Sequence, residues 1–517
     1  MLKGYFNMEK KKSKLLLSIF TLCLCIGAMC FGVYAATSVE YTLGGSIQYE
    51  ANGVFVDIET SLYASTEDYN YAVGHRAKVM RDLDQALNYG QNTMPGTDRL
   101  AKVNSFVDSV KSTSSDVSQD SVSFESESLP IHLGSYQENQ RAYVYYVIIN
   151  ITNYGDSDIS YIVDLGNLKP YNDAGEPILY SNTIVIPLKS LGDISAKQNE
   201  QPTEYNIIIS FELYDIATSI DTTFDDISIT LNKGKLEEQP QFVAQKQDYT
   251  FQLNDNITDA TLTGYNGNDE IIVVPSTCEI DGQTYPVTAI GENAFISQSQ
   301  MTDLYIPYGI TEIKTSAFEL YSSYLTSIYL PDSILNLQDN AFCELYSILN
   351  IRISENATNF DSTLINGLRS IHIPASVNDV YIGEAQELTY IEVDDENQTY
   401  YDIDGVLYND VEKTLVIYPT KSFLTSFTIP EDIVRIDVAY GWANDSSLSN
   451  VIFSDTAHTW TIYNTIYDEE SDEWVANEPV HTISVEELQD STLMATYLKD
   501  IYSYFHIYSA IWIKNVD

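Results

Sequence analysis

The stretch MTDLYIPYGITEIKTSAF (301–318) is followed closely by LTSIYLPDSILNLQDNAF (325–342), which has the same pattern. Each copy places apolar residues at alternate positions, then a proline, a second apolar pair and a final Ala-Phe. Alternate residues of a strand point to the same side, proline ends the strand, and phenylalanine fills the space between neighbouring coils. A repeat of this length predicts a solenoid of stacked coils.

Further copies extend this repeat in both directions. The Ala-Phe pair ends at Phe295, Phe318 and Phe342, at intervals of 23 and 24 residues. The residues predicted to end strands are Pro307, Pro331, Pro374 and Pro430. Degenerate copies are ILNIRIS (348–354), LRSIHIP (368–374), LTYIEVD (388–394), LTSFTIP (424–430) and LSNVIFS (448–454). The third to fifth copies lack the Ala-Phe turn, so the pattern alone leaves their register open.

The repeats resemble the BspA-type leucine-rich repeats of bacterial surface proteins. The opening segment (273–295) and the insertion YYDIDGVLYNDVEKTLVIYP (400–419) are also similar to that family. The resemblance covers about residues 249–457 and implies a surface protein that binds partners. We therefore expect a solenoid over residues 248–457. The last coil would otherwise expose its apolar side, so we expect a cap over 458–517, with a helix at 484–505.

The outward-facing positions of the repeat strands are the candidate binding residues. Stacked coils should align them in two ladders. The first ladder is Tyr305, Tyr329, Arg352, His372, Glu392 and Thr428, and the second is Asp303, Ser327, Asn350, Ser370, Tyr390 and Ser426. The predicted site consists of Tyr305, Tyr329, Arg352, His372, Glu392, Tyr390 and Asp303. Exposed tyrosines often anchor interfaces, so Tyr305 and Tyr329 are the preferred contacts. The alternative is that these residues face solvent and bind nothing.

The N-terminus predicts export. Lys10, Lys11, Lys12 and Lys14 precede an apolar run (15–33) and Ala35, which is typical of a signal peptide over residues 1–36. The run is long enough to serve instead as an uncleaved membrane anchor. Beyond it only Cys278 and Cys343 remain, too few for a disulfide framework, and we expect both to be buried apolar residues.

Residues 37–232 predict a β-sandwich. Short stretches of alternating or continuous apolar residues, such as RAYVYYVIINITN (141–153) and TEYNIIISFELYD (203–215), are separated by turn residues. Between about residues 76 and 111 the apolar spacing becomes helical, which predicts a helical insertion. KGKLEEQPQFVAQKQ (233–247) predicts a linker to the solenoid.

The N-terminal region resembles the camelysin and TasA-like family of exported Gram-positive proteins. The resemblance rests on GVYAATSVEYTLGGSIQYE (32–50), YVIINITNYGDSDISY (146–161), YNIIISFELYD (205–215) and DISITLN (226–232). It implies a surface or biofilm-fibre role in which residues 37–50 could add as a strand to a neighbour's sheet. An ordinary edge strand is the alternative. The helical insertion departs from the family's pattern.

Charge and motifs exclude several classes of function. The chain has 26 Lys and Arg against 74 Asp and Glu, a net charge of -48, which repels nucleic acid. The six histidines are scattered, and neither a nucleophile elbow nor a phosphate loop is present. We predict neither an enzyme nor a cofactor. DDEN (394–397) with Asp402 and Asp404 raises a calcium site as an alternative to a solvated turn, although the spacing of a known calcium loop is missing.

The sequence therefore predicts a secreted or cell-surface protein of Gram-positive type, mainly β. It should bind protein or glycan partners through the outward ladders, as an adhesin does. It should meet membrane only through residues 1–36. A matrix-fibre subunit that assembles through residues 37–50 is the alternative, and a secreted protease is the third, suggested only by the camelysin resemblance.

Overall fold

The computed structural model describes residues 38–515, apart from gaps. The longer gaps are 91–99, 103–129, 133–142, 166–182, 214–220, 224–227 and 440–447, and shorter ones are 43–46, 52–53, 66, 68, 297, 321–323, 364, 366, 384, 469–472, 500–504 and 506–508. The predicted signal peptide (1–36) lies outside the described residues. The fold class predicted from the sequence is confirmed, because the chain is mainly β with an N-terminal β-rich region and a solenoid of about seven turns.

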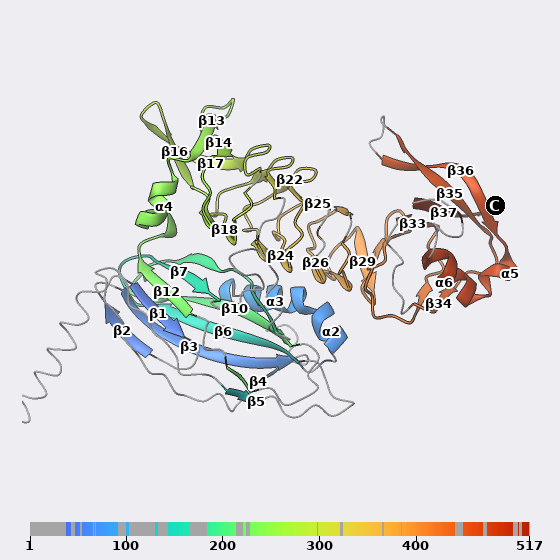
Figure 1. The fold of residues 1–517 in the computed structure, drawn as a ribbon, viewed down its shortest axis with the longest axis horizontal. Coiled ribbons are helices and arrows are strands. Elements are labelled where there is room, and N and C mark those ends of the chain that lie inside the picture. Colours follow the sequence, from blue (N-terminus) through green and yellow to red (C-terminus); the bar gives the residue numbers. More distant parts are fainter. Residues whose placement is uncertain are drawn as a thin grey trace, which may run out of the picture.

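The N-terminal region contains two antiparallel sheets (Figure 1). The first has the order β1 (Ser38–Thr42), β12 (Ser228–Lys233), β7 (Ile159–Asp164), β9 (Leu191–Ile194). The second has the order β2 (Ile47–Ala51), β3 (Val54–Ser65), β6 (Tyr143–Asn153), β10 (Thr203–Leu213), β8 (Thr183–Pro187), with β4 (Leu100–Lys102) beside β3. A separate pair is formed by β5 (Pro130–His132) and β11 (Asp221–Thr223). Ile149 and Ile209 pack with Tyr161 and Leu231 in one core between the sheets.

Strand β6 is buried on both faces, and this explains its nearly continuous apolar sequence. Val147, Ile149 and Ile151 belong to the core between the sheets. Val144, Tyr146 and Ile148 face the other way and pack against two helices, α2 (Tyr69–Gly74) and α3 (Arg76–Asn88). The second sheet is therefore covered on its outer face.

The helical insertion is shorter than predicted. Helix α3 ends at Asn88, and Leu100–Lys102 form a strand that pairs with β3, so a helix over these three residues is wrong. Residues 103–111 lie outside the described part of the chain. The expected linker (233–247) is also structured, as η2 (Leu236–Glu238) and α4 (Pro240–Gln245), with Leu236 and Phe242 buried.

The solenoid stacks parallel strands from successive coils. One sheet face, here called the ladder face, is formed by β15 (Ile271–Val273), β18 (Asp303–Tyr305), β21 (Ser327–Tyr329), β24 (Asn350–Arg352), β26 (Ser370–Ile373) and β28 (Tyr390–Val393). Other strands of the coils are β13 (Tyr249–Leu253), β14 (Ala260–Tyr265), β16 (Thr277–Ile280), β17 (Gln283–Ile290), β19 (Glu312–Ile313), β20 (Phe318–Glu319), β22 (Asn336–Leu337), β23 (Phe342–Cys343), β25 (Asn359–Thr363) and β27 (Asp379–Ile382). Both Cys278 and Cys343 are buried and free, as predicted.

The C-terminal part closes the array with a seven-stranded sheet. Its order is β29 (Tyr400–Ile403), β30 (Val406–Asn409), β31 (Thr414–Ile417), β33 (Arg435–Ala439), β37 (Ser509–Lys514), β35 (Trp460–Asp468), β36 (Glu473–Ile483). The pair β32 (Ser426–Ile429) and β34 (Asn450–Phe453) lies beside α5 (Val485–Leu488) and α6 (Ser491–Lys499). Trp460 and Trp512 are buried in a core shared by these elements, so the region has the packing expected of a cap.

The phenylalanines of the repeat stack as one column. The Phe318 ring centroid lies 4.8 Å from that of Phe295 and 5.0 Å from that of Phe342, and the rings are nearly parallel. All three side chains are fully buried. The column ties three successive coils together, which is the role predicted for these residues.

Phe318→Ala should therefore lower the free energy of unfolding by about 3–5 kcal/mol, because it leaves a cavity at the middle of the column. Urea denaturation followed by tyrosine and tryptophan fluorescence measures this loss. Tyr308→Ala is the matched control, since Tyr308 is 76% exposed and its removal should change the stability by less than about 0.5 kcal/mol. Equal effects of the two changes would contradict the role of the column.

Candidate binding face of the solenoid

The strand register aligns two steps of each predicted ladder. Tyr329 pairs with Arg352, and Ser327 pairs with Asn350. His372 pairs with Glu392, and Ser370 pairs with Tyr390. Tyr305 pairs with Val273 of the preceding coil. The side chains therefore stack along one face in the sequence order that the repeat predicted.

The expected exposure of this face is wrong. The first-ladder side chains from Tyr305 to Glu392 are all buried, at 3–9% exposure, and Asp303 and Tyr390 are half-buried. Strand β9 and helix α3 of the N-terminal region lie against the ladder face, and Figure 1 shows α3 below β24 and β26. Only Thr428 and Ser426, on the later strand β32, are exposed. The predicted site is therefore an interface between two parts of one chain.

A buried charge cluster joins the two parts. Glu212 of β10 is fully buried, and its carboxylate accepts a hydrogen bond from Arg76 of α3 at 2.7 Å. The other carboxylate oxygen of Glu212 is bonded by Arg369 of the solenoid. Arg76 also donates to the Leu349 carbonyl oxygen at 2.7 Å. One carboxylate thus bonds to the guanidinium groups of two arginines that come from different domains.

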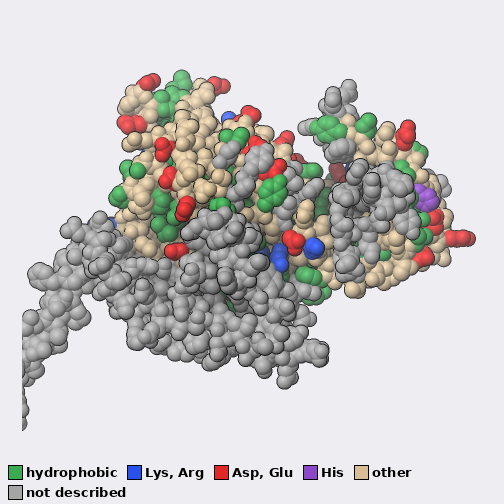
Figure 2. Space-filling model, in the orientation of Figure 1, with side chains coloured by type: hydrophobic (Ala, Val, Ile, Leu, Met, Phe, Trp, Pro, Cys, Tyr) green, Lys and Arg blue, Asp and Glu red, His purple; other side chains and the backbone are tan. Residues whose placement is uncertain are grey.

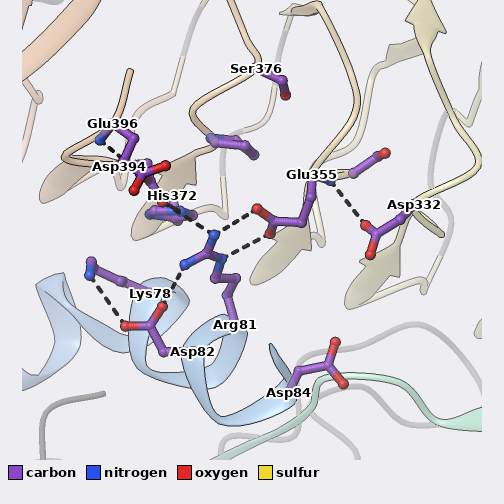
Figure 3. Close-up of polar contacts among 12 residues, drawn as sticks. Lys78, Arg81, Asp82, Asp84, Asp332, Glu355, His372, Ser376, Asp394 and Glu396 are labelled. Carbon is purple, nitrogen blue, oxygen red and sulfur yellow. Dashed lines mark hydrogen bonds and ion pairs between the residues drawn. The ribbon is translucent and has the colours of Figure 1, made fainter. Parts of the chain in front are cut away.

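A second contact lies one turn further along α3. Arg81 donates from Nε and Nη2 to the two carboxylate oxygens of Glu355, at 2.8 and 2.6 Å. Its Nη2 also lies 3.2 Å from Asp394, and its Nη1 lies 2.8 Å from Asp82 on the same helix. Figure 3 shows Arg81 reaching from the helix toward the solenoid carboxylates. Bidentate pairing of this kind fixes orientation as well as adding energy.

The tyrosines of the ladder bond to carboxylates of the N-terminal region. Tyr329 donates its hydroxyl to Asp84 at 2.9 Å, and Tyr305 donates to Asp193 at 3.0 Å. Burial raises the pKa of Asp84, although the charge of Arg352 and the bonds from Asn88 and Tyr329 oppose that rise. The Arg352 guanidinium lies 4.9 Å from the Tyr329 ring centre and pairs with Asp332.

Lys189 lies among aromatic rings from both parts. Its ammonium is 5.8 Å from the ring centre of Tyr205, 5.5 Å from that of Tyr305 and 4.8 Å from that of Tyr329. Burial lowers the pKa of Lys189, while Asp84 and Asp193 favour its charged form. Cation–π contacts of this kind gain strength where water is excluded.

His372 and Tyr390 lie at the far end of this interface. Burial, together with the charges of Arg81, Lys78 and Arg352, lowers the pKa of His372 well below its usual range. The His372 ring is therefore neutral at physiological pH. Tyr390 packs against His75, with ring centres 4.5 Å apart.

A cavity of about 240 Å³ lies between β7, the end of β8 and β12 on one side and β15 and β18 on the other. Asp164, Glu270 and Asp303 line it with several hydroxyl groups, and Ser190 donates to Asp303 at 2.6 Å. In the part of the chain that the structure describes, no three metal-binding side chains come together. In the predicted calcium turn, Asp394 pairs with Arg81, and Asp402 accepts a hydrogen bond from the Val393 amide.

The comparisons agree with the solenoid geometry. Residues 277–389 match the family model described as BspA type leucine rich repeat region, in six copies. Leucine-rich-repeat proteins are generally non-enzymatic binding scaffolds. No curated protein matches the chain. Among the described residues, no helix has the length and apolar character needed to cross a bilayer.

Several solved bacterial structures are similar to part of the chain. A leucine rich cell surface protein from Faecalibacterium prausnitzii is 23% identical with a TM-score of 0.30, over 40% of this chain and 69% of that one. The pneumococcal vaccine antigen PcpA is 17% identical with a TM-score of 0.33, over 40% and 62%. A leucine-rich repeat protein from Eubacterium ventriosum is 22% identical with a TM-score of 0.29, over 40% and 57%. The chain spans less than two thirds of the last two structures.

Sequence reasoning missed the residues of the N-terminal region that meet the ladder face, which are Arg76, Arg81, Asp84, Lys189, Asp193 and Glu212. Two signals were present. Strand β6 is apolar on both faces, so something had to cover its outer face. The second signal is a short segment with three basic residues in a chain that has few of them. These residues are Arg76, Lys78 and Arg81.

Glu212→Gln should lower the free energy of unfolding by about 3–5 kcal/mol, because it leaves the buried Arg76 without a counter-charge. Urea denaturation at constant salt measures the change. Lys413→Ala is the control, because Lys413 pairs with Asp410 and Asp432 on an exposed surface and its loss should cost less than about 1 kcal/mol. A loss below about 1 kcal/mol for Glu212→Gln would show that the cluster does not hold the domains together.

Proposed function

We propose that the protein is an exported bacterial cell-surface protein that binds protein or glycan partners through its solenoid, as an adhesin does. The observation that carries this proposal is the run of register-matched coils whose sequence matches BspA-type repeats. Rigid stacked coils present side chains at fixed spacing, which suits recognition of large partners. The leader-like sequence of residues 1–36 supports export.

The acidic surface agrees with an extracellular setting. Asp and Glu side chains are scattered over the visible face of the solenoid, with few Lys or Arg side chains beside them (Figure 2). A net charge of -48 keeps a protein soluble and favours partners that carry positive charge.

Protease shaving of intact producing cells tests export. We expect peptides from residues 248–457 to appear in the supernatant while a cytosolic marker protein stays inside the cells. Release of these peptides only after lysis would overturn the cell-surface assignment.

Adhesion tests the binding role. Cells with and without the gene are compared on immobilised mucin, fibronectin and collagen. We expect several-fold weaker adhesion to at least one of them without the gene, and purified protein lacking residues 1–36 should block adhesion of the cells that carry the gene by competing for the same surface. Equal adhesion to all three would contradict the proposal.

One observation favours a matrix fibre as a second candidate function. Among the described residues, strand β1 lies at the edge of its sheet and pairs with β12 alone, from Ser38 opposite Asn232 to Thr42 opposite Ser228. An N-terminal edge strand is suited to exchange with a neighbouring copy. Light scattering of protein beginning at residue 37 should then detect large assemblies that protein beginning at residue 51 does not form. Two monomeric samples would exclude strand exchange.

A further inference from the structure

Helix α3 carries three basic side chains close together, followed by the acidic Asp82 and Asp84. Arg76, Lys78 and Arg81 lie within six residues, although the whole chain has only 26 Lys and Arg among 517 residues. The same helix lies against the ladder face, where it contacts β24 and β26. The basic segment and the predicted binding face therefore meet.

The two sides of α3 have different chemistry. Its apolar side, with Val79, Met80 and Leu83, packs against the outer face of the sandwich sheet. Its polar side meets the solenoid through the Arg81 pair with Glu355, the Asp84 bond to Tyr329 and a 3.3 Å hydrogen bond from the Ala77 amide to Ser370. The helix is thus anchored to one domain and presented to the other as an amphipathic ligand would be.

The solenoid offers a matching row of carboxylates. Asp332, Glu355 and Asp394 follow the ladder strands β21, β24 and β28, and the coil of β26 between the last two has no carboxylate at this position. Figure 3 shows these carboxylates along the side of the solenoid that α3 approaches.

The contact is polar and incompletely satisfied. Among the described residues, Asn350 Nδ2 and both ring nitrogens of His372 are buried without a hydrogen-bond partner in the protein. Buried polar atoms without partners weaken an interface. Polar interfaces between domains resemble transient contacts between proteins. A partner that satisfied these groups could compete with α3.

We infer that the ladder face from β21 to β28, with its acidic row, is a docking surface for a basic amphipathic helix of a partner protein, and that α3 is its built-in occupant. The inference rests on the proposed function, since it names the surface and partner chemistry of that binding. Because α3 belongs to the same chain, it competes with the partner helix for the ladder face at a high effective concentration. The partner therefore binds the native chain more weakly until α3 leaves that face.

A synthetic peptide tests this inference directly. The probe is fluorescein-labelled YNYAVGHRAKVMRDLDQALNYG (69–90), which contains α2 and α3. It is titrated by fluorescence anisotropy against full-length protein lacking only the leader, in wild-type form and as Arg81→Glu. The substitution turns an attraction to Glu355 and Asp394 into a repulsion and should loosen α3 from this part of the face, so we expect at least tenfold tighter peptide binding to the variant.

Two controls keep the outcome interpretable. A peptide with the same Arg81→Glu change should bind at least tenfold more weakly than the native peptide, and added salt should weaken native-peptide binding. Arg81→Gln, which removes the attraction without adding a repulsion, repeats the test if Arg81→Glu fails to fold by circular dichroism. Equally weak peptide binding to wild-type and folded variant protein would overturn the inference.

The outcome is distinguishable from failure of the proposed function. Gene-dependent adhesion without peptide binding to the released variant would overturn the docking surface and leave the surface-binding role standing. Peptide binding to the variant without any gene-dependent adhesion would support the docking surface and overturn the adhesin role.

Discussion

Buried charges must be paired, and this constraint determines how the two halves of the chain fit together. Glu212 is fully buried and bonds to Arg76 from its own domain and Arg369 from the solenoid. Removing the solenoid would leave Glu212 with Arg76 alone, and removing the N-terminal region would leave Arg369 without its carboxylate partner. These buried ion pairs fix the position of the sandwich relative to the solenoid, whereas apolar packing alone would let one slide over the other.

The tyrosines of the ladder suit this arrangement because each has an apolar body and a polar tip. The rings of Tyr305 and Tyr329 contribute to apolar clusters at the interface, while their hydroxyls bond to Asp193 and Asp84. The same properties make tyrosine common in binding sites. The sequence pattern predicted a surface for partners, and in the structure the ladder tyrosines instead contact the N-terminal region of the same chain.

The sequence predicted the solenoid, but it did not predict that the N-terminal region covers the ladder face. The reason is physical. Coil register follows from local periodicity, so the ladder order of Tyr329, Arg352 and His372 could be read directly from the repeats. Docking depends on contacts such as that between Arg81 and Glu355, which are 274 residues apart and leave no periodic trace. Strand β6 held the available signal, because apolar residues on both of its faces require a second covering layer.

The account depends most directly on the ladder face being covered in solution. Hydroxyl-radical footprinting of the full-length protein, read by mass spectrometry, measures the exposure of each tyrosine ring. Tyr305 and Tyr329 should be protected, while Tyr308 and Tyr381, which are 76% and 50% exposed, should be oxidised rapidly. Oxidation of Tyr305 and Tyr329 at the rate of Tyr308 would contradict the docking of the N-terminal region on the solenoid.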